Sequence, residues 1–130
     1  MLFRSTVTHL LHRAIRIVTG PDAKQRGSLV HPDYLRFDYP LDRSLTREER
    51  DAVEAEVRRA IREDMTVVAE EMSMAEAVKA GADAFFDEKY GEKVRTIRME
   101  DYSHELCGGT HCRATGQVGS FVITSERSIG

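Results

Sequence analysis

The sequence contains no tryptophan, only three prolines and only two cysteines among its 130 residues. The cysteines, Cys107 and Cys112, are five positions apart and offer no useful disulfide framework. No apolar run approaches the roughly 20 residues that a membrane-spanning helix needs, and residues 1–4 do not begin a signal-peptide core. We therefore expect a soluble cytoplasmic protein. In such a protein a cysteine beside a histidine is more often a metal ligand or a reactive group.

An excess of positive charge is also lacking, because the formal net charge is −3. This excludes a generally basic nucleic-acid-binding protein but leaves room for a local basic patch. Arginine strongly outnumbers lysine. That bias is compatible with an RNA partner, because arginine suits bidentate phosphate contacts. Solvated helix faces also explain the bias, and composition alone favours this second explanation.

The length and the hydrophobic fraction of 41% predict one domain with a single core. Residues 5–19 have apolar side chains at three- and four-residue spacings, which predicts a helix that Gly20-Pro21 ends. Residues 25–31 and 34–39 are predicted to be two strands of a hairpin around His31-Pro32-Asp33.

Two capping boxes, Thr46 with Glu49 and Ser73 with Glu76, predict helix starts. The first helix should cover about 47–63, and the second should be short and end at Gly81. Further strands are predicted at 65–71, 93–99 and 117–125, whereas the Gly-rich stretch 105–116 should be irregular. Together, these predicted helices and strands indicate an α+β fold with helices packed on a mainly antiparallel sheet.

Cys107 and His111 are the strongest candidates for metal ligands. Thiolate and neutral imidazole are good zinc ligands, and Gly108 and Gly109 let the backbone bend tightly between them. The spacing alone is weak evidence. His9 on the first helix supplies a third ligand, which would place the site between that helix and the Gly-rich loop.

Other residues near these ligands leave alternatives open. His12 is three residues from His9 and either rotates toward the ion or, as we prefer, is a partly buried helix residue bonded to a backbone carbonyl. His104 either forms a hydrogen bond with a metal ligand or is an exposed loop residue, and we favour the second interpretation. Cys112 is expected not to bind the metal. Glu105 either assists a base or, more commonly, is a loop carboxylate.

Asp38 and Arg36 leave two interpretations that we weigh equally. Asp38 is either a buried residue that orders a pocket or binds a histidine proton, or it forms a cross-strand surface pair with Arg36.

Several motifs, in this order along the chain, resemble the editing domain of alanyl-tRNA synthetases, which threonyl-tRNA synthetases and free-standing editing proteins share. The resemblance covers about residues 4–126 and favours the synthetase branch. The matching segments are Thr8-His9-Leu10-Leu11-His12, Gln25-Arg26-Gly27-Ser28-Leu29-Val30, Leu35-Arg36-Phe37-Asp38, Glu88-Lys89-Tyr90-Gly91, Val94-Arg95, Glu105-Leu106-Cys107-Gly108-Gly109-Thr110-His111, Thr115-Gly116 and Val118-Gly119.

The resemblance implies an aminoacyl-tRNA hydrolase that cleaves the ester of seryl- or glycyl-tRNA specific for alanine. It implies Zn²⁺ as the cofactor, bound by His9, Cys107 and His111, and it suggests Thr8, Gln25 and Ser28 near the substrate pocket. The family's first histidine falls on Ser5, and its usual glycine before the Glu-Lys-Tyr run falls on Asp87.

These departures leave a second hypothesis, a metal-deficient tRNA-binding module without catalysis, and a weaker third one, a purely structural zinc. On the resemblance, residues 1–130 are interpreted as a single editing domain excised from a longer synthetase. Its partners would be mischarged alanine-specific tRNA and the remaining synthetase domains, with no membrane.

Overall fold

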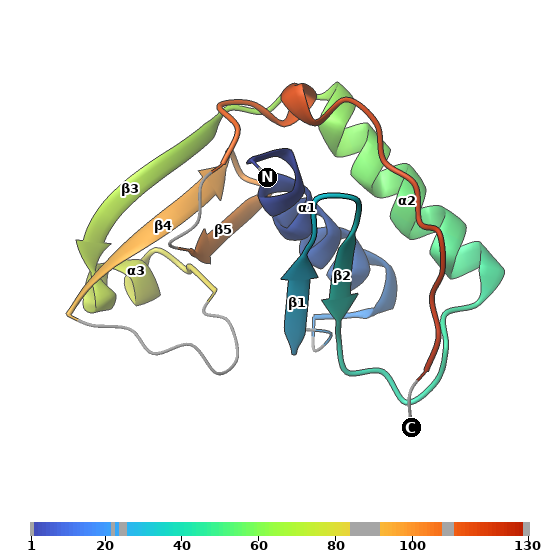
Figure 1. Ribbon diagram of the computed structural model, residues 1–130. Helices are drawn as coiled ribbons and strands as arrows, with labels where there is room; N and C mark the ends of the chain where they lie inside the picture. The colour runs from blue at the N-terminus through green and yellow to red at the C-terminus, as the bar shows by residue number, and fades with distance from the viewer. Residues whose placement is uncertain (1, 22, 24–25, 84–91, 108–110, 129–130) are drawn as a thin grey trace.

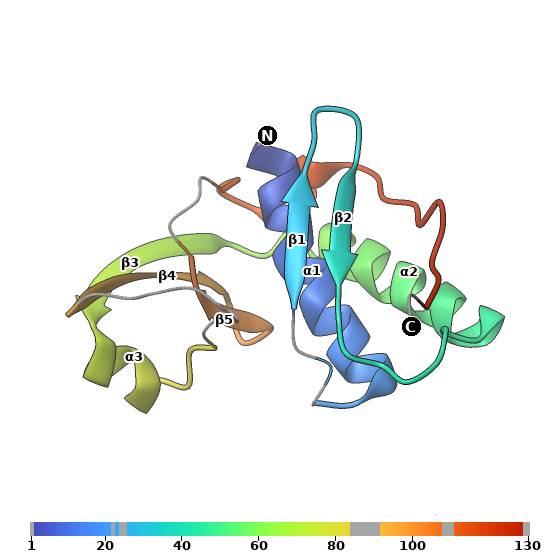
Figure 2. The same cartoon turned by 60° about the horizontal axis from the view of Figure 1, so that its bottom comes forward.

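A computed structural model of the chain describes residues 2–21, 23, 26–83, 92–107 and 111–128. Helix α1 (Leu2–Thr19) is central and contacts α2, the first hairpin, strand β5 and a short 3-10 helix, η1. Figures 1 and 2 show the hairpin on one side of α1, α2 on another, and a separate sheet beside them. The helix ends as predicted at Gly20, whose φ of 122° is unfavourable for other residues.

Helix α2 (Arg47–Arg62) packs along α1 and forms the main core with it. Its predicted capping box is present: the Thr46 hydroxyl accepts a hydrogen bond from the Glu49 backbone, and the Glu49 carboxylate accepts one from the Thr46 backbone. Apolar side chains at helical spacing face α1, as expected for a helix with one buried stripe. The buried apolar residues of the two helices are Val7, Leu10, Leu11, Ala14, Ile15, Val53, Val57, Ala60 and Ile61.

The strands form two separate antiparallel sheets, which confirms the predicted α+β class. Strands β1 (Gly27–Val30) and β2 (Leu35–Asp38) are the predicted hairpin, with Ser28 opposite Phe37. Strands β3 (Val67–Ser73), β4 (Lys93–Met99) and β5 (Ser103–Leu106) pair in that order. The short α3 (Met74–Lys79) follows β3 and begins at the second capping box.

The prediction of a last strand at 117–125 is wrong. Residues Thr115–Val118 form η1, and the segment from 119 to 128 is extended but pairs with no strand in the described part of the chain. Side chains of α2 satisfy its backbone instead: Arg50 and Arg58 donate to the carbonyls of Ile123 and Phe121, and Glu54 accepts from the Ile123 N–H. Figure 1 shows this segment running along α2.

Strand β5 was missed, because the sequence from residue 105 onward was expected to be irregular. Ser103-His104-Glu105-Leu106 contains one aliphatic residue and shows no alternation of apolar and polar side chains. A tight turn follows β4, in which Glu100 has a φ of 49° and the Tyr102 N–H bonds the Met99 carbonyl at 2.9 Å. This turn returns the chain beside β4 and makes β5.

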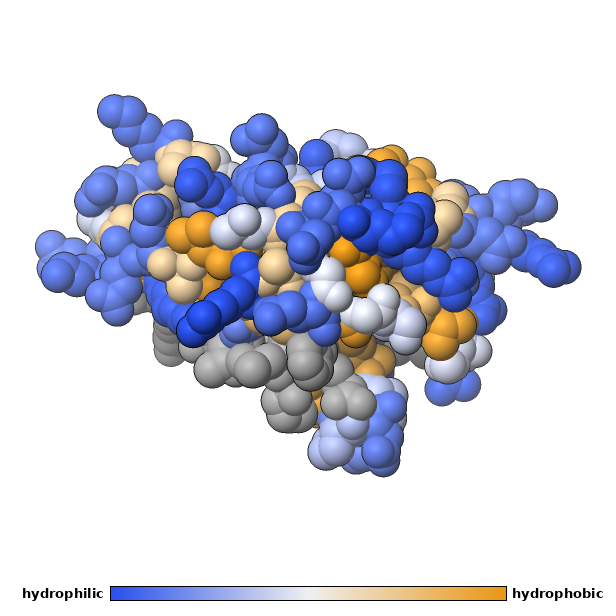
Figure 3. Space-filling model, turned by 90° about the horizontal axis from the view of Figure 1, so that it is seen from above, coloured by the Kyte–Doolittle hydropathy of each residue, from blue (hydrophilic) through white to orange (hydrophobic). Residues whose placement is uncertain are grey.

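Two arginines of α2 and one that precedes it form ion pairs within the molecule. Arg58 lies 3.1 Å from Glu54 and Arg59 lies 2.7 Å from Glu56, and Arg43 pairs with Glu49 at 2.6 Å. On the face seen in Figure 3, apolar side chains lie in separate patches among hydrophilic ones. None of the described helices is long and apolar enough to cross a membrane. The ion pairs of Arg43, Arg58 and Arg59 favour solvated helix faces as the explanation of the arginine bias in the sequence.

Candidate metal centre

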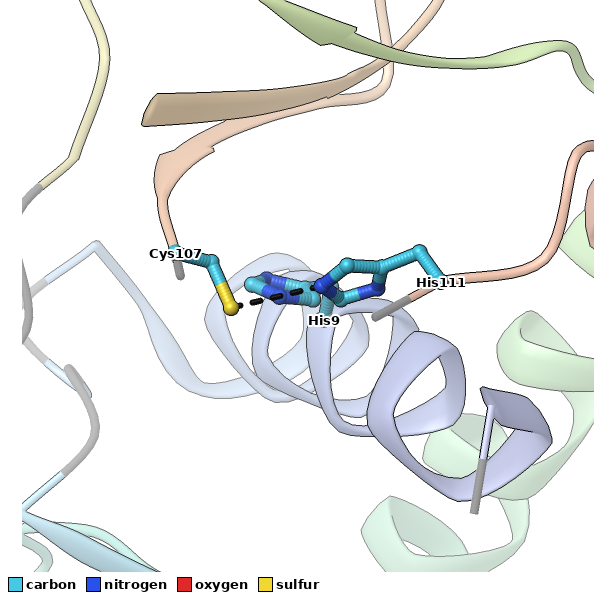
Figure 4. A group of neighbouring side chains, drawn as sticks. All are labelled: His9, Cys107 and His111. Carbon is cyan, nitrogen blue, oxygen red and sulfur yellow. Dashed lines mark hydrogen bonds between the residues drawn. The ribbon is translucent and has the colours of Figure 1, made fainter. Parts of the chain in front are cut away.

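His9, Cys107 and His111 lie together although the first two are 98 positions apart in the sequence. Their ligand atoms all lie within 4.8 Å of one another. The Cys107 Sγ is 3.3 Å from the His111 Nε2, and the ring centroids of His9 and His111 are 4.7 Å apart. Figure 4 shows His9 pointing outward from α1 toward the two other side chains, which come from the chain after β5. This is the arrangement expected between the first helix and the Gly-rich loop.

His9 is held by a buried carboxylate. It is 2% exposed, and its Nδ1 forms a short hydrogen bond with the Oε1 of Glu105. The second oxygen of Glu105, Oε2, forms an equivalent bond with the Nδ1 of His12. With Nδ1 bonded to the carboxylate, Nε2 is the His9 nitrogen that would bind a metal. A carboxylate behind a ligating histidine is common in zinc sites.

His111 is held by a hydroxyl group of α1. Its Nδ1 lies 3.5 Å from the Oγ1 of Thr6, a fully buried residue one turn before His9. The same Oγ1 accepts the backbone N–H of Cys112 at 3.0 Å. The Thr6 hydroxyl thus holds both His111 and the residue that follows it against α1. It again leaves Nε2 as the nitrogen that faces Cys107.

The electrostatics of the cluster make metal binding dependent on pH. Burial, together with His9 and Arg95, lowers the pKa of His111 to about 3, so the ring is neutral at pH 7. Burial acts to lower the pKa of His9, but Glu105 and Cys107 outweigh it and raise that pKa. Burial acts to raise the pKa of Glu105, but His9 and His12 lower it. His9 therefore releases a proton when a metal binds, as metal sites generally require.

The donor set fits zinc. Two imidazole nitrogens and one thiolate are preferred zinc ligands, and three protein ligands leave a fourth coordination position. Each histidine is also oriented through its other nitrogen, by Glu105 or by Thr6. The structure therefore contains a possible metal-binding group at the three predicted residues.

The three predicted pocket residues occupy different situations. Thr8 is buried on α1 next to His9, whereas Ser28 is exposed on β1. Gln25 lies outside the described residues, as do Asp87 and the Glu88-Lys89-Tyr90-Gly91 motif. Their roles toward a substrate stay predictions.

The structure decides the alternatives for the neighbouring histidines. His12 is buried, its Nδ1 is bonded to Glu105, and it is not a member of the ligand group found among the described residues. His104 is not an exposed loop residue, because it lies half-buried on β5. Cys112 is buried outside the ligand group, as predicted.

Arg36 and Asp38 form a surface ion pair. The Arg36 Nε is 3.3 Å from the Asp38 Oδ1, and both side chains are substantially exposed. The two residues are neighbours along β2 rather than across strands. The interpretation of Asp38 as a buried pocket residue is therefore wrong.

Glu105 and Thr6 are the two residues that sequence reasoning missed. Glu105 was expected to be a loop carboxylate, and Thr6 received no role. Alternate residues of a strand face the same side, so β5 places Glu105 on the side of Cys107. Thr6 precedes His9 by three residues, a helical spacing that puts both on one face. Glu105 could be predicted only by recognising strand β5. Thr6 could be predicted from its three-residue spacing to His9 on the first helix.

Comparison with known proteins extends these observations. The profile of the threonyl and alanyl tRNA synthetase second additional domain matches residues 94–130. The chain is 53% identical over 124 residues to an alanine–tRNA ligase from Nitratidesulfovibrio vulgaris. It is 50% identical to the enzyme of that name from Paramagnetospirillum magneticum and 47% identical to that from Xanthomonas campestris pv. campestris.

The resemblance to alanyl-tRNA synthetases is confirmed. The similarity covers 95% of this chain but only 14% of the Nitratidesulfovibrio relative. The chain thus aligns with one segment of that much longer relative. The ligands Cys107 and His111 lie within the region that matches the domain profile.

Proposed function

We propose that the chain hydrolyses the ester bond of mischarged alanine-specific tRNA, carrying serine or glycine, as an editing domain. The observation that supports this most directly is the group of His9, Cys107 and His111, oriented by Glu105 and Thr6. It occurs in a chain similar to alanine–tRNA ligases over 95% of its length. The proposed partners are the tRNA and the rest of a synthetase chain, and the proposed location is the cytoplasm.

The proposal answers a physical limit on amino-acid selection. Side chains as small as those of glycine, alanine and serine differ by only about 1–3 kcal/mol in a binding pocket. One binding step therefore cannot exclude the wrong amino acid completely. A second site that hydrolyses the wrong product is the general solution.

In this proposal the three ligands hold Zn²⁺ and other polar residues position the substrate. A bound zinc ion supplies Lewis acidity at the ester or lowers the pKa of a water molecule. Thr8, Gln25 and Ser28 offer hydroxyl and amide groups that position the attacking water and the side-chain hydroxyl of a bound serine. These three roles follow from the family resemblance.

Hydrolysis of seryl-tRNA specific for alanine tests the proposal. With zinc supplied, the chain should release serine above the uncatalysed rate, and Cys107→Ala should remove both the bound zinc and this activity. Cys112→Ala is the matched control, because Cys112 lies outside the ligand group. Absence of release from zinc-loaded protein would refute editing by this chain.

The alternative is a tRNA-binding module that has lost a complete metal site. The observation that favours it is Ser5, a poor ligand one helical turn before His9 on the same face of α1. Metal analysis by mass spectrometry separates the two functions. Stoichiometric zinc supports the hydrolase, whereas folded, zinc-free protein that binds tRNA supports the module.

A further inference from the structure

We propose that Glu105 is a positioning residue that aims the ligand His9, and that His12 anchors this carboxylate rather than binding the metal. The inference rests on the metal site of the proposed function. Glu105 divides its two oxygens between the two rings, Oε1 to His9 and Oε2 to His12. The three residues are each 2% exposed.

The first step of the argument concerns the cost of burying a carboxylate. A buried charge is strongly unfavourable unless it is paired and hydrogen-bonded. His9 and His12 provide both kinds of interaction, and their three-residue spacing on α1 places both rings on the side of Glu105. The carboxylate is therefore fixed from two directions, and the ring of His9 is fixed with it.

The second step concerns how Cys107 and His9 are held relative to each other. Glu105 belongs to β5, and Cys107 follows this strand directly. The backbone around them is anchored, because the Leu106 N–H bonds the Asp83 carbonyl at 2.8 Å and the Cys107 N–H bonds the Arg95 carbonyl at 3.0 Å. One rigid segment thus holds both Cys107 and the carboxylate that orients His9. Glu105 thereby connects α1 to the sheet at the metal centre.

The third step concerns His12. Its Nδ1 is bonded to Glu105, and its ring lies 5.7 Å from that of Phe37 on β2. These contacts hold the ring between the carboxylate and the hairpin, away from the group formed by His9, Cys107 and His111. His12 therefore stabilises the position of Glu105 and does not fill the fourth coordination position.

Zinc affinity measured by competition with a chromophoric chelator tests the inference in the full 130-residue chain. Glu105→Gln should lower the affinity about 10- to 100-fold, the usual loss when the hydrogen-bond partner of a metal ligand changes. Glu71→Gln is the matched control, because Glu71 is an exposed glutamate on β3 of the same sheet. It should leave the affinity unchanged.

Variants of His12 test its role separately. His12→Leu removes the donor to Oε2 and should weaken zinc binding, whereas His12→Gln keeps a donor and should restore most of the affinity. In the Glu105→Gln background, His12→Leu should cause little further loss, because both residues act through one contact. A merely structural role would lower the melting temperature without this pattern in zinc affinity.

Defined outcomes overturn the inference. Folded Glu105→Gln protein that binds zinc within about threefold of the parent would refute it. If that variant does not fold, parental affinity in both His12 variants would refute it. A parent chain that binds no zinc would refute the metal site and this inference together. If the parent and the variants show the expected zinc affinities but the parent does not hydrolyse the ester, only the proposed function is refuted.

Discussion

At the scale of single residues, each of the two candidate histidine ligands has a polar partner. Glu105 orients His9 from behind, and Thr6 contacts His111 from α1. Both partners are at most 2% exposed, so water cannot replace these contacts easily. The ligands were predictable from residue type and family motif. Their partners required knowledge of which strand and which helix face meet.

Ser5→His should tighten zinc binding. Position 5 lies on the face of α1 that carries His9, one turn earlier, so a histidine there can offer a fourth nitrogen. A competition titration measures the change. Ile17→His adds a histidine at a position of the same helix that is 49% exposed, and it should leave the affinity unchanged. Equal affinities for Ser5→His and the parent would show that this side chain does not reach the ion.

At the scale of secondary-structure elements, local signals specified the helices better than the strands. The two capping boxes lie at the predicted residues, and Gly20 follows the last residue of α1. Strand β5 lacks an alternating pattern and exists because a tight turn pairs it with β4. The segment after η1 has the composition of a strand, but α2 binds its backbone through arginine and glutamate side chains.

Thr46→Ala should destabilise the protein by about 1 kcal/mol, the usual cost of losing an N-cap side chain. The Thr46 hydroxyl accepts the Glu49 N–H at 3.1 Å, and alanine leaves that donor to water. Urea unfolding measures the change. The control is Thr124→Ala, because Thr124 is exposed on the segment that follows η1. A change as small as that of the control would show that the cap contributes nothing.

At the scale of the whole molecule, the candidate metal centre lies where α1 meets the chain after the three-stranded sheet. The main core belongs chiefly to α1 and α2, and a smaller apolar cluster lies between α3 and the three-stranded sheet. His9 belongs to α1, whereas Cys107 and His111 follow β5. A bound ion would therefore connect the two parts of the fold at the point where Glu105 already does.

Zinc removal by a chelator should lower the melting temperature without unfolding the protein at 25 °C. A ligand that binds only the folded state adds stability according to its concentration and affinity. The main core does not depend on the ion, unlike that of a zinc finger. Circular dichroism and calorimetry measure both effects. Complete unfolding on chelation would instead support a purely structural zinc.

The sequence by itself determined the helices, the hairpin and the α+β class through local periodicity and capping, and it indicated the three candidate ligands through donor chemistry together with the family motif. Only the tertiary structure decided the roles of Glu105, His12 and the segment after η1. Those roles depend on contacts between residues more than 60 positions apart, such as Glu105 with His9 or Arg58 with Phe121. A local pattern cannot show which distant partner satisfies a buried carboxylate or an unpaired backbone group.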